Sequence, residues 1–400
     1  RGWDKFVINN STSTLFNFVT IKNLAGERGD YHGMEINNSS TTLKNTIITK
    51  PDDMGFSGLL VKNSTSTFSN VEVSGFKDRE GDYGEFETAL SIENSNVEID
   101  NSSIKDNYKG LVINGSNFSL TNNNFINNNE EPVFIQNSFP ENINNNSFSN
   151  NKYNGIFIES LWFKNNQISF YKENPYIINS TLTVPEEKEL KINPGSVIKF
   201  NIGKNASIKA EGIIEAEGKK DKPIIFTGLR DNLEDIANEY GEEYETNTDS
   251  SSNSSTPGSW GNISLKNNEA TSTLSNAIIR YGGRDSNSVV EVSGKSEILN
   301  SVFENNMEGG LFIESGTSSV IKNNIFNKNN TDNHADSGLY LTTDGLPKIS
   351  NNLFKNNAIG FYWKNGNNKL GEDKTCEDIK DRLGIFKDNE TDLYCSCCKK

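Results

Sequence analysis

The hydrophobic and polar positions of the chain repeat as a triplet of one apolar residue, any residue and asparagine. Neighbouring copies lie roughly 20–31 residues apart, the spacing expected of a solenoid whose repeat is one supersecondary unit. The copies are Leu15-Phe16-Asn17, Leu43-Lys44-Asn45, Phe68-Ser69-Asn70, Ile99-Asp100-Asn101, Leu120-Thr121-Asn122, Ile143-Asn144-Asn145, Phe163-Lys164-Asn165, Leu274-Ser275-Asn276, Ile298-Leu299-Asn300, Ile321-Lys322-Asn323 and Ile349-Ser350-Asn351. About ten residues before each copy comes a glycine or small residue with an alternating apolar strand, as in Gly310-Leu311-Phe312-Ile313. The pattern predicts a coil repeated about a dozen times.

The asparagine of each triplet predicts where the coil turns. Asparagine tolerates the left-handed backbone conformation that a sharp corner between two strands demands. Stacked asparagine side chains at the same corner of successive coils can also hydrogen-bond to one another as a ladder. The apolar residues just after each triplet then begin the inward face of the next strand. On this pattern Phe303, Phe326 and Phe354 are predicted to form an internal aromatic ladder.

These motifs carry a family resemblance. The order Gly-apolar-x-apolar, then apolar-x-Asn-Asn-x-Phe-x-x-Asn, resembles the right-handed parallel β-helix repeats of the pectate-lyase-like superfamily. Segments of the second half resemble the opening coils of secreted and surface-attached modules of this fold: Leu182–Pro185, Leu190–Phe200, Gly212–Gly218, Lys222–Thr227 and Trp260–Ile263. The resemblance implies an all-β, right-handed parallel β-helix over most of residues 1–365. It implies no single activity, because this fold carries lyases, hydrolases, epimerases, adhesins and passive stalks.

Three segments are predicted along the chain. Residues 1–173 form a first β-helix module, residues 174–373 a second module, and residues 374–400 a small cysteine-containing tail that breaks the pattern. Within the second module, residues 229–258 are acidic, rich in serine and without periodicity, which predicts a mobile excursion loop. In the tail, Thr375 can cap a short helix that ends near Leu383.

Composition narrows the setting. The chain has 54 acidic and 39 basic residues and a net charge of -15, which makes nucleic acid an unsuitable partner. Only 33% of residues are hydrophobic, which suits a coil that buries thin stripes against its neighbours. No apolar run reaches the length of a membrane span. The chain starts at Arg1, as expected of a processed chain or a fragment, and we expect it to be extracellular or at the cell surface.

An acidic edge is the densest candidate for chemistry. Loops before consecutive strand starts carry carboxylates that stacking would bring together, and Ca²⁺ prefers such oxygen ligands. The predicted Ca²⁺ ligands are Asp52, Asp53, Asp82 and Glu85. A solvated acidic rim and a general acid–base pair for sugar chemistry remain alternatives. The segment Asp332-Asn333-His334 with Asp336 is a second possible metal loop or a plain polar turn.

The cysteines lie only in the tail, at Cys376, Cys395, Cys397 and Cys398. Disulfides are the default in an exported chain, and four cysteines allow three pairings. A four-cysteine zinc site is an alternative, although adjacent Cys397 and Cys398 rarely both reach one tetrahedral ion. Free or intermolecular thiols are the third possibility.

No catalytic set is predicted. The resemblance to polygalacturonases requires Asn-Thr-Asp, an Asp pair and Gly-His-Gly in that order. Here Asn247-Thr248-Asp249 lies in the acidic loop, and both His32-Gly33 and Asp52-Asp53 precede it. For lyase-type members, Arg280 and Arg284 beside Asp285 are the nearest analogue of a basic site, but Gly282-Gly283 places a turn between the two arginines.

The sequence therefore predicts a protein with a structural, adhesive or glycan-binding role and no cofactor other than Ca²⁺. Its expected partner is a cell-envelope glycan or another surface protein, including a second copy of itself. Polar outward faces with exposed tyrosine can hold sugars through many weak contacts. A polysaccharide lyase or hydrolase and a subunit of an extracellular filament or sheath are the alternatives. An acid or base set on an outward strand face would favour the enzyme, and an uncapped coil end would favour the filament.

Overall fold

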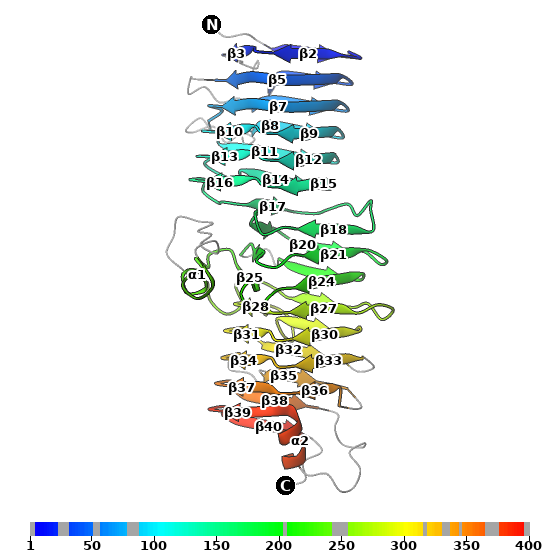
Figure 1. Ribbon diagram of the computed structural model, residues 1–400, viewed down its shortest axis with the longest axis vertical. Coiled ribbons are helices and arrows are strands. Elements are labelled where there is room, and N and C mark those ends of the chain that lie inside the picture. Colours follow the sequence, from blue (N-terminus) through cyan, green and yellow to red (C-terminus); the bar gives the residue numbers. More distant parts are fainter. Residues whose placement is uncertain are drawn as a thin grey trace. The chain divides into compact units, whose positions relative to one another are not determined.

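The computed structural model describes residues 5–22, 32–50, 57–77, 88–202, 206–241, 255–314, 318–329, 337–343, 346–364 and 376–395. The chain divides into two compact units, the first chiefly Arg1–Lys164 and the second chiefly Ile177–Glu245 with Ser252–Lys400. Each unit is a right-handed parallel β-solenoid, and the two together contain about 12 turns (Figure 1). The predicted fold class is confirmed.

In the first unit, the described strands pair in parallel with the equivalent strands of neighbouring coils. One sheet contains β1 (Phe6–Asn9), β4 (His32–Asn37), β6 (Ser57–Lys62), β8 (Thr88–Glu93), β11 (Lys109–Asn114), β14 (Val133–Gln136) and β17 (Ile156–Ile158). The other sheet turns a corner and contains β2 (Thr14–Asn17), β3 (Thr20–Lys22), β5 (Ser40–Thr49), β7 (Thr65–Ser74), β9 (Asn96–Asp100), β10 (Ser103–Lys105), β12 (Asn117–Thr121), β13 (Asn124–Ile126), β15 (Phe139–Asn144) and β16 (Ser147–Ser149). The inward residues stack in columns, as Met34, Leu59, Leu90 and Leu111 do.

The second unit has three parallel strand columns. The first contains β22 (Val197–Phe200), β25 (Ile224–Gly228), β28 (Ala277–Arg280), β31 (Val302–Glu304), β34 (Ile325–Asn327), β37 (Asn352–Lys355) and β39 (Gly384–Lys387). The second contains β18 (Gln167–Phe170), β21 (Glu189–Ile192), β24 (Ile213–Glu217), β27 (Ser272–Ser275), β30 (Ser296–Leu299), β33 (Ser319–Lys322) and β36 (Lys348–Ser350). The third contains β20 (Thr181–Val184), β23 (Ser207–Ala210), β26 (Ile263–Leu265), β29 (Val290–Val292), β32 (Gly309–Ile313), β35 (Ser337–Leu341), β38 (Ile359–Trp363) and β40 (Thr391–Cys395). The division between the units falls within β19 (Tyr176–Ile178).

The asparagine corners are confirmed at nearly every predicted position. The left-handed asparagines of the triplets are Asn45, Asn70, Asn101, Asn122, Asn145, Asn276, Asn300, Asn323 and Asn351. Two predictions were wrong. At the first copy the left-handed residue is Phe18 (φ 57°), so the corner falls one position after Asn17. Asn165 has no positive φ, and it stands where the chain leaves the first unit.

The predicted ladder of corner side chains exists in part. The side-chain amide of Asn70 donates to Asn45 Oδ1 at 2.7 Å, and that of Asn45 donates to Asn17 Oδ1 at 2.9 Å. In the second unit, Asn323 donates to Asn300 Oδ1 at 3.0 Å. These bonds are exposed to solvent, so each contributes little net stability.

A second asparagine ladder, one position after the corner, lies inside the coil. The side-chain amide of Asn128 donates to Asn151 Oδ1 at 2.8 Å and to the carbonyl oxygen of Ile104 at 3.1 Å. Asn324 and Asn352 repeat the arrangement in the second unit, with an amide-to-oxygen distance of 3.1 Å. These buried amides bond the corner of one coil to the next and leave no polar group unpaired there.

The predicted internal aromatic ladder is confirmed and is longer than expected. Ring centroids of Phe303 and Phe326 lie 4.9 Å apart, those of Phe326 and Phe354 lie 5.1 Å apart, and Phe386 continues the stack at 4.8 Å. The glycine at the second position of each facing strand makes room for these rings. A Cβ atom on Gly360 would lie 2.8 Å from the Phe386 ring, closer than real side chains approach.

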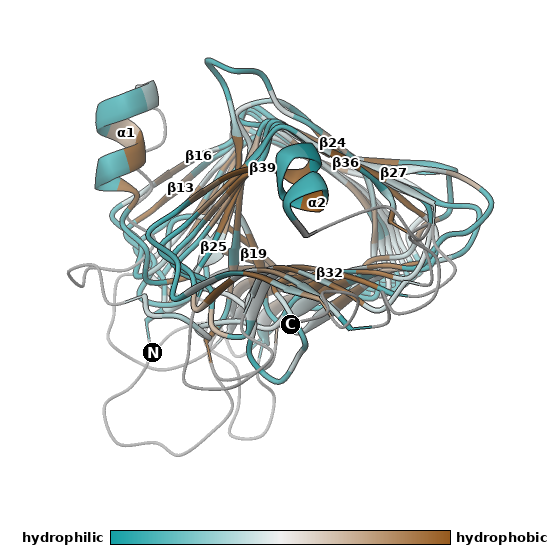
Figure 2. Ribbon diagram, turned by 90° about the horizontal axis from the view of Figure 1, so that it is seen from below, coloured by the Kyte–Doolittle hydropathy of each residue, from teal (hydrophilic) through white to brown (hydrophobic). Residues whose placement is uncertain are grey.

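Part of the predicted excursion loop, residues 229–258, is instead ordered as a helix. Helix α1 (Glu234–Tyr240) follows β25. Its residue Ile236, and Leu233 just before the helix, are buried against Val197 and Ile225 of the coil exterior. Figure 2 shows α1 on the outside of the ring of strands. The acidic composition concealed these two anchors, while residues 242–254 lie outside the described range.

The predicted tail, residues 374–400, does not break the pattern. Its strands β39 and β40 pair in parallel with β37 and β38 and so form a further coil. The predicted short helix is confirmed as α2 (Cys376–Leu383), which contacts β36, β39 and β40. Ile379 and Leu383 are buried, and Figure 2 shows α2 across the opening of this coil. The helix therefore covers the apolar interior at this end.

Candidate functional site

The predicted Ca²⁺ ligands cannot be placed. Asp52, Asp53, Asp82 and Glu85 lie outside the described residues, and so do the loop at His334 and the Asn247-Thr248-Asp249 motif. Among the residues that the structure describes, no group of three or more His, Cys, Asp or Glu is arranged to hold a metal ion. The Ca²⁺ site therefore stays a prediction.

The cysteines are described only in part. Cys395 ends β40 and is 7% exposed, and Cys376 begins α2. Cys397 and Cys398 lie outside the described range. The disulfide pairing stays a prediction.

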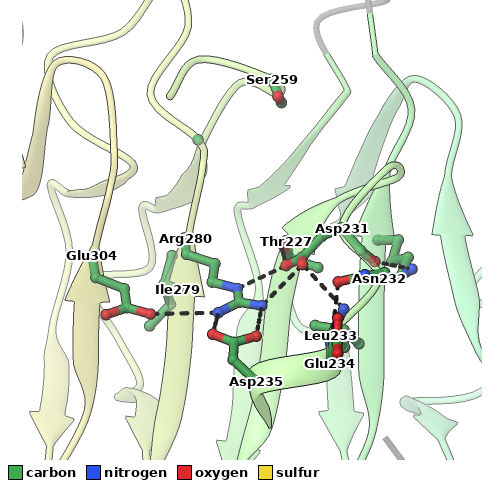
Figure 3. A network of polar contacts seen from close by, with 12 residues as sticks. Thr227, Asp231, Asn232, Leu233, Glu234, Asp235, Ser259, Ile279, Arg280 and Glu304 are labelled. Atoms are coloured by element: carbon green, nitrogen blue, oxygen red, sulfur yellow. Dashed lines mark hydrogen bonds and ion pairs between the residues drawn. The ribbon is translucent and has the colours of Figure 1, made fainter. Parts of the chain in front are cut away.

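Arg280, the nearest analogue of a lyase-type basic residue, lies in a buried network on the outer side of β28. Its Nε and Nη2 atoms donate to the Asp231 carboxylate at 2.7 and 2.9 Å. Its Nη1 and Nη2 atoms donate to the Asp235 carboxylate at 2.6 and 2.8 Å. Figure 3 shows the guanidinium between these two carboxylates, and Glu304 Oε1 lies 3.6 Å from Nη1.

The network fixes the turn that leads into α1. Asp231 is fully buried, and its carboxylate also accepts hydrogen bonds from the Thr227 hydroxyl at 2.6 Å and the Leu233 backbone amide at 3.2 Å. The buried ammonium group of Lys199 donates to the Asp231 carbonyl oxygen at 2.6 Å. We call Arg280, Asp231 and Asp235 the arginine clamp. It holds α1 against the apolar exterior of the coil.

Electrostatics keep the clamp charged. Burial alone would lower the pKa of Arg280, but the hydrogen bonds and charges of Asp235 and Asp231 outweigh burial and raise it. The hydrogen bond from Arg280 lowers the pKa of Asp235. Arg280 is 1% exposed, and all three guanidinium nitrogens donate to carboxylates. It therefore stays protonated and cannot accept a proton from a substrate.

A row of aromatic side chains on the third column of the second unit is a candidate binding surface. Phe312, Tyr340, Tyr362 and Tyr394 are aligned in register on β32, β35, β38 and β40. Their ring centroids lie 5.0, 4.8 and 4.8 Å apart in succession. The residues just before them in the strands point inward, so alternation points this row outward. We call these four residues the outer aromatic row.

The rings of this row differ in exposure. Tyr340 is 8% exposed because it lies between the Tyr362 ring, which stacks on it, and the Phe312 ring, which is tilted by 38°. Tyr394 is 52% exposed, and its ring is turned 75° from the plane of Tyr362. Burial raises the pKa of Tyr340 and that of Tyr362, so both phenols remain hydrogen-bond donors at neutral pH. The row therefore combines apolar ring surface with hydroxyl groups.

Residues 5–181 match the family described as "Right handed beta helix region". Together with the parallel columns and left-handed corners, this match confirms the resemblance noted in the repeats. The chain has the right-handed parallel β-helix fold. No curated protein matches it, so the family supplies the fold and no activity.

The outer aromatic row of this β-helix protein could have been found in the sequence, but the stronger repeat of the inward residues draws attention away from it. Its first three members hold the same place in Gly310-Leu311-Phe312, Gly338-Leu339-Tyr340 and Gly360-Phe361-Tyr362. The inward residues dominate the periodicity, so the outward aromatic residue between them goes unremarked. Within the described residues, no helix is both long and apolar enough to cross a membrane.

Proposed function

We propose that this β-helix protein is a non-catalytic binding scaffold, outside the cell or at its surface, whose outer aromatic row holds a glycan. The observation that carries the proposal is the register of Phe312, Tyr340, Tyr362 and Tyr394 on four successive strands. Inward residues repeat because packing of the core requires them. Packing does not require aromatic residues on the outward face, so their repetition there supports a binding role.

Tyrosine suits a surface of this kind. It offers a large, rigid contact area at a low cost in conformational entropy, and its hydroxyl can hydrogen-bond to a polar partner. A sugar presents apolar C–H faces and hydroxyl groups together, so it matches both parts of the side chain. The exposed ring of Tyr394 provides the ring face, and Tyr362 provides a phenol beside it.

Arg280 does not support the polysaccharide lyase alternative, because its guanidinium group is hydrogen-bonded to Asp231 and Asp235 within the clamp. The filament or sheath alternative draws no support from α2, which covers the interior of its coil. The proposal includes Ca²⁺ at Asp52, Asp53, Asp82 and Glu85 as a stabilising ion rather than a catalyst. A cell-envelope glycan is the proposed partner, and another surface protein or a second copy of the chain is an outcome that the experiment must distinguish.

A glycan array with the intact protein tests the proposal. We expect the wild type to bind a defined set of glycans and Tyr394→Ala to lose at least about tenfold in affinity. Tyr171→Ala is the matched control, because Tyr171 is 38% exposed but follows β18 in another column of the same unit. Binding that neither substitution changes would exclude the row as the binding surface.

Turnover is measured in parallel. The protein is incubated with pectin, alginate and other uronate-rich glycans, and both new reducing ends and unsaturated products are assayed. Binding without product is expected. Steady product release would instead promote the enzyme alternative, and self-association without glycan binding would promote the filament.

A further inference from the structure

The outer aromatic row has a direction, and this direction restricts its ligand. The row runs across the strands, with one ring per coil and centroids 4.8 to 5.0 Å apart. This repeat is close to the length of one sugar in an extended polysaccharide chain. A chain lying along the row would therefore meet one aromatic side chain per sugar, whereas a compact or branched glycan would meet one or two.

The rings do not all offer the same surface. The stacked ring of Tyr362 and the tilted ring of Phe312 lie on either side of Tyr340, which is 8% exposed, so its phenol and ring edge are what a ligand can reach. Tyr394 ends the stack with its ring turned, so its face is the most open of the four. The row thus offers one stacking position at Tyr394, followed by phenol hydroxyls at Tyr362 and Tyr340.

Charges of both signs lie around the row, and Lys364 is close enough to Tyr362 to act on its phenol. The position next to Phe312 on the preceding strand β29 is Glu291, so the row continues into a carboxylate. At the other end, Asp392 of β40 is paired with Lys380 at 3.0 Å. The chain as a whole carries a net charge of -15. Glu291 and the net negative charge of the protein would repel a polyanionic chain, and an uncharged chain would meet no such repulsion.

From these observations, and resting on the proposed function, we infer that the ligand is an uncharged, unbranched polysaccharide that lies along the outer aromatic row across successive coils. One sugar stacks on Tyr394, and the following sugars exchange hydrogen bonds with the phenols of Tyr362 and Tyr340. Affinity then rises with the length of the oligosaccharide until the chain spans the row.

Titration calorimetry with the full chain tests the inference. The probes are linear cello-, manno- and xylo-oligosaccharides of increasing length, and oligogalacturonates and oligoalginates of the same lengths, each at low and high salt. We expect a neutral series to bind with affinity that rises with length and then levels off, and the anionic series to bind at least about tenfold more weakly at low salt.

Variants locate the contact. Tyr394→Ala should weaken the longest neutral ligand at least about tenfold, and Tyr362→Phe, which removes one hydroxyl, should weaken it by a smaller factor of about three to ten. Tyr171→Ala should change nothing. Circular dichroism and the unfolding midpoint of each variant establish that the coil is intact.

The possible outcomes distinguish failure of the inference about an uncharged, unbranched ligand from failure of the proposed glycan binding. Tighter binding of anionic oligomers that salt weakens, or affinity that does not depend on length, would overturn the inference and leave glycan binding standing. The absence of binding to every glycan would overturn the proposed function itself, and with it the inference. Equal loss in Tyr394→Ala and Tyr171→Ala would place the ligand elsewhere and would also overturn the inference.

Discussion

The two units share the inside of the coil and differ on its outside. In both, a left-handed asparagine turns the chain and the next asparagine is buried, as at Asn122-Asn123 and Asn323-Asn324. The outward positions of both units carry exposed ion pairs, such as Lys62–Glu93 in the first unit at 2.9 Å. The second unit adds the arginine clamp, helix α1 and the outer aromatic row.

This difference teaches where to look for function in a repeated fold. Every coil must present the same inward surface to the next coil, so inward residues recur in each turn. Outward residues have no such constraint and can differ from one unit to the other. The clamp and the row occur once each in the described residues, and both are external.

The largest expected effect is the loss of stability when a buried ion pair is removed, compared with the removal of an exposed pair. Arg280→Met should lower the free energy of unfolding by about 3–5 kcal/mol, because it leaves the buried Asp231 carboxylate without its charged partner. The measurement is urea unfolding followed by the fluorescence of Trp260 and Trp363, which are buried in the second unit.

The matched control is Lys62→Met in the first unit. The Lys62 and Glu93 side chains are 46% and 37% exposed, so their pair should contribute less than about 1 kcal/mol. The double variant Arg280→Met/Asp231→Asn should recover part of the loss, since no buried charge remains. Equal losses in Arg280→Met and Lys62→Met would show that the clamp is no more important than a surface pair.

The second prediction concerns what the units share. Asn128→Ala and Asn324→Ala should each cost about 2–3 kcal/mol, because each strands buried hydrogen-bonding groups of the neighbouring coils. Amide hydrogen exchange should report the loss in the strands around each substitution.

Asn323→Gly is the control for this prediction. Glycine accepts a φ of 58° and the lost hydrogen bond is exposed, so the cost in stability should stay below about 1 kcal/mol. Similar costs for Asn323→Gly and Asn324→Ala would show that the buried ladder carries no special role.

The contrast between inside and outside also explains how much the sequence could predict. Triplets such as Leu120-Thr121-Asn122 repeat with the coil, so the fold, the left-handed corners and the ladder of Phe303, Phe326 and Phe354 follow from period and residue type alone. The buried ladder was visible as Asn-Asn pairs, but the sequence alone does not say which asparagine faces inward.

The clamp and α1 could not be predicted in this way. Arg280 and Asp231 lie 49 residues apart, and no repeat relates them. Helix α1 has one buried residue, Ile236, and Leu233 just before it is also buried, within an acidic segment that resembles a loop in composition. Such features depend on tertiary contacts that occur once, and periodicity carries no information about them.

The third prediction tests whether the first unit has an external feature of its own. If Asp52, Asp53, Asp82 and Glu85 bind Ca²⁺, the ion should stabilise the folded chain by about 1.4 kcal/mol at ten times its dissociation constant. The measurement is the melting temperature with millimolar Ca²⁺, with the same concentration of Mg²⁺, and with a chelator. Asp82→Asn should reduce the shift. A melting temperature that does not respond to Ca²⁺ or to the chelator would leave a solvated acidic rim.

The smallest expected effect is the loss of the stability that the Arg280–Asp235 pair contributes as the pH falls. The variant Asp235→Asn removes this contribution and so measures it. The pKa of Asp235 is lowered in the folded chain by the hydrogen bond from Arg280, so the stability that this pair contributes is fully present above the ordinary aspartate value of 3.8. It is lost as the pH falls below that value towards the lowered pKa, because protonation then favours the unfolded chain. Asp235 is 65% exposed, so the contribution should be less than about 1 kcal/mol. Urea unfolding of wild type and Asp235→Asn should therefore differ at pH 7 and converge under strong acid, and a difference that persists at the lowest pH would assign the effect to packing rather than to charge.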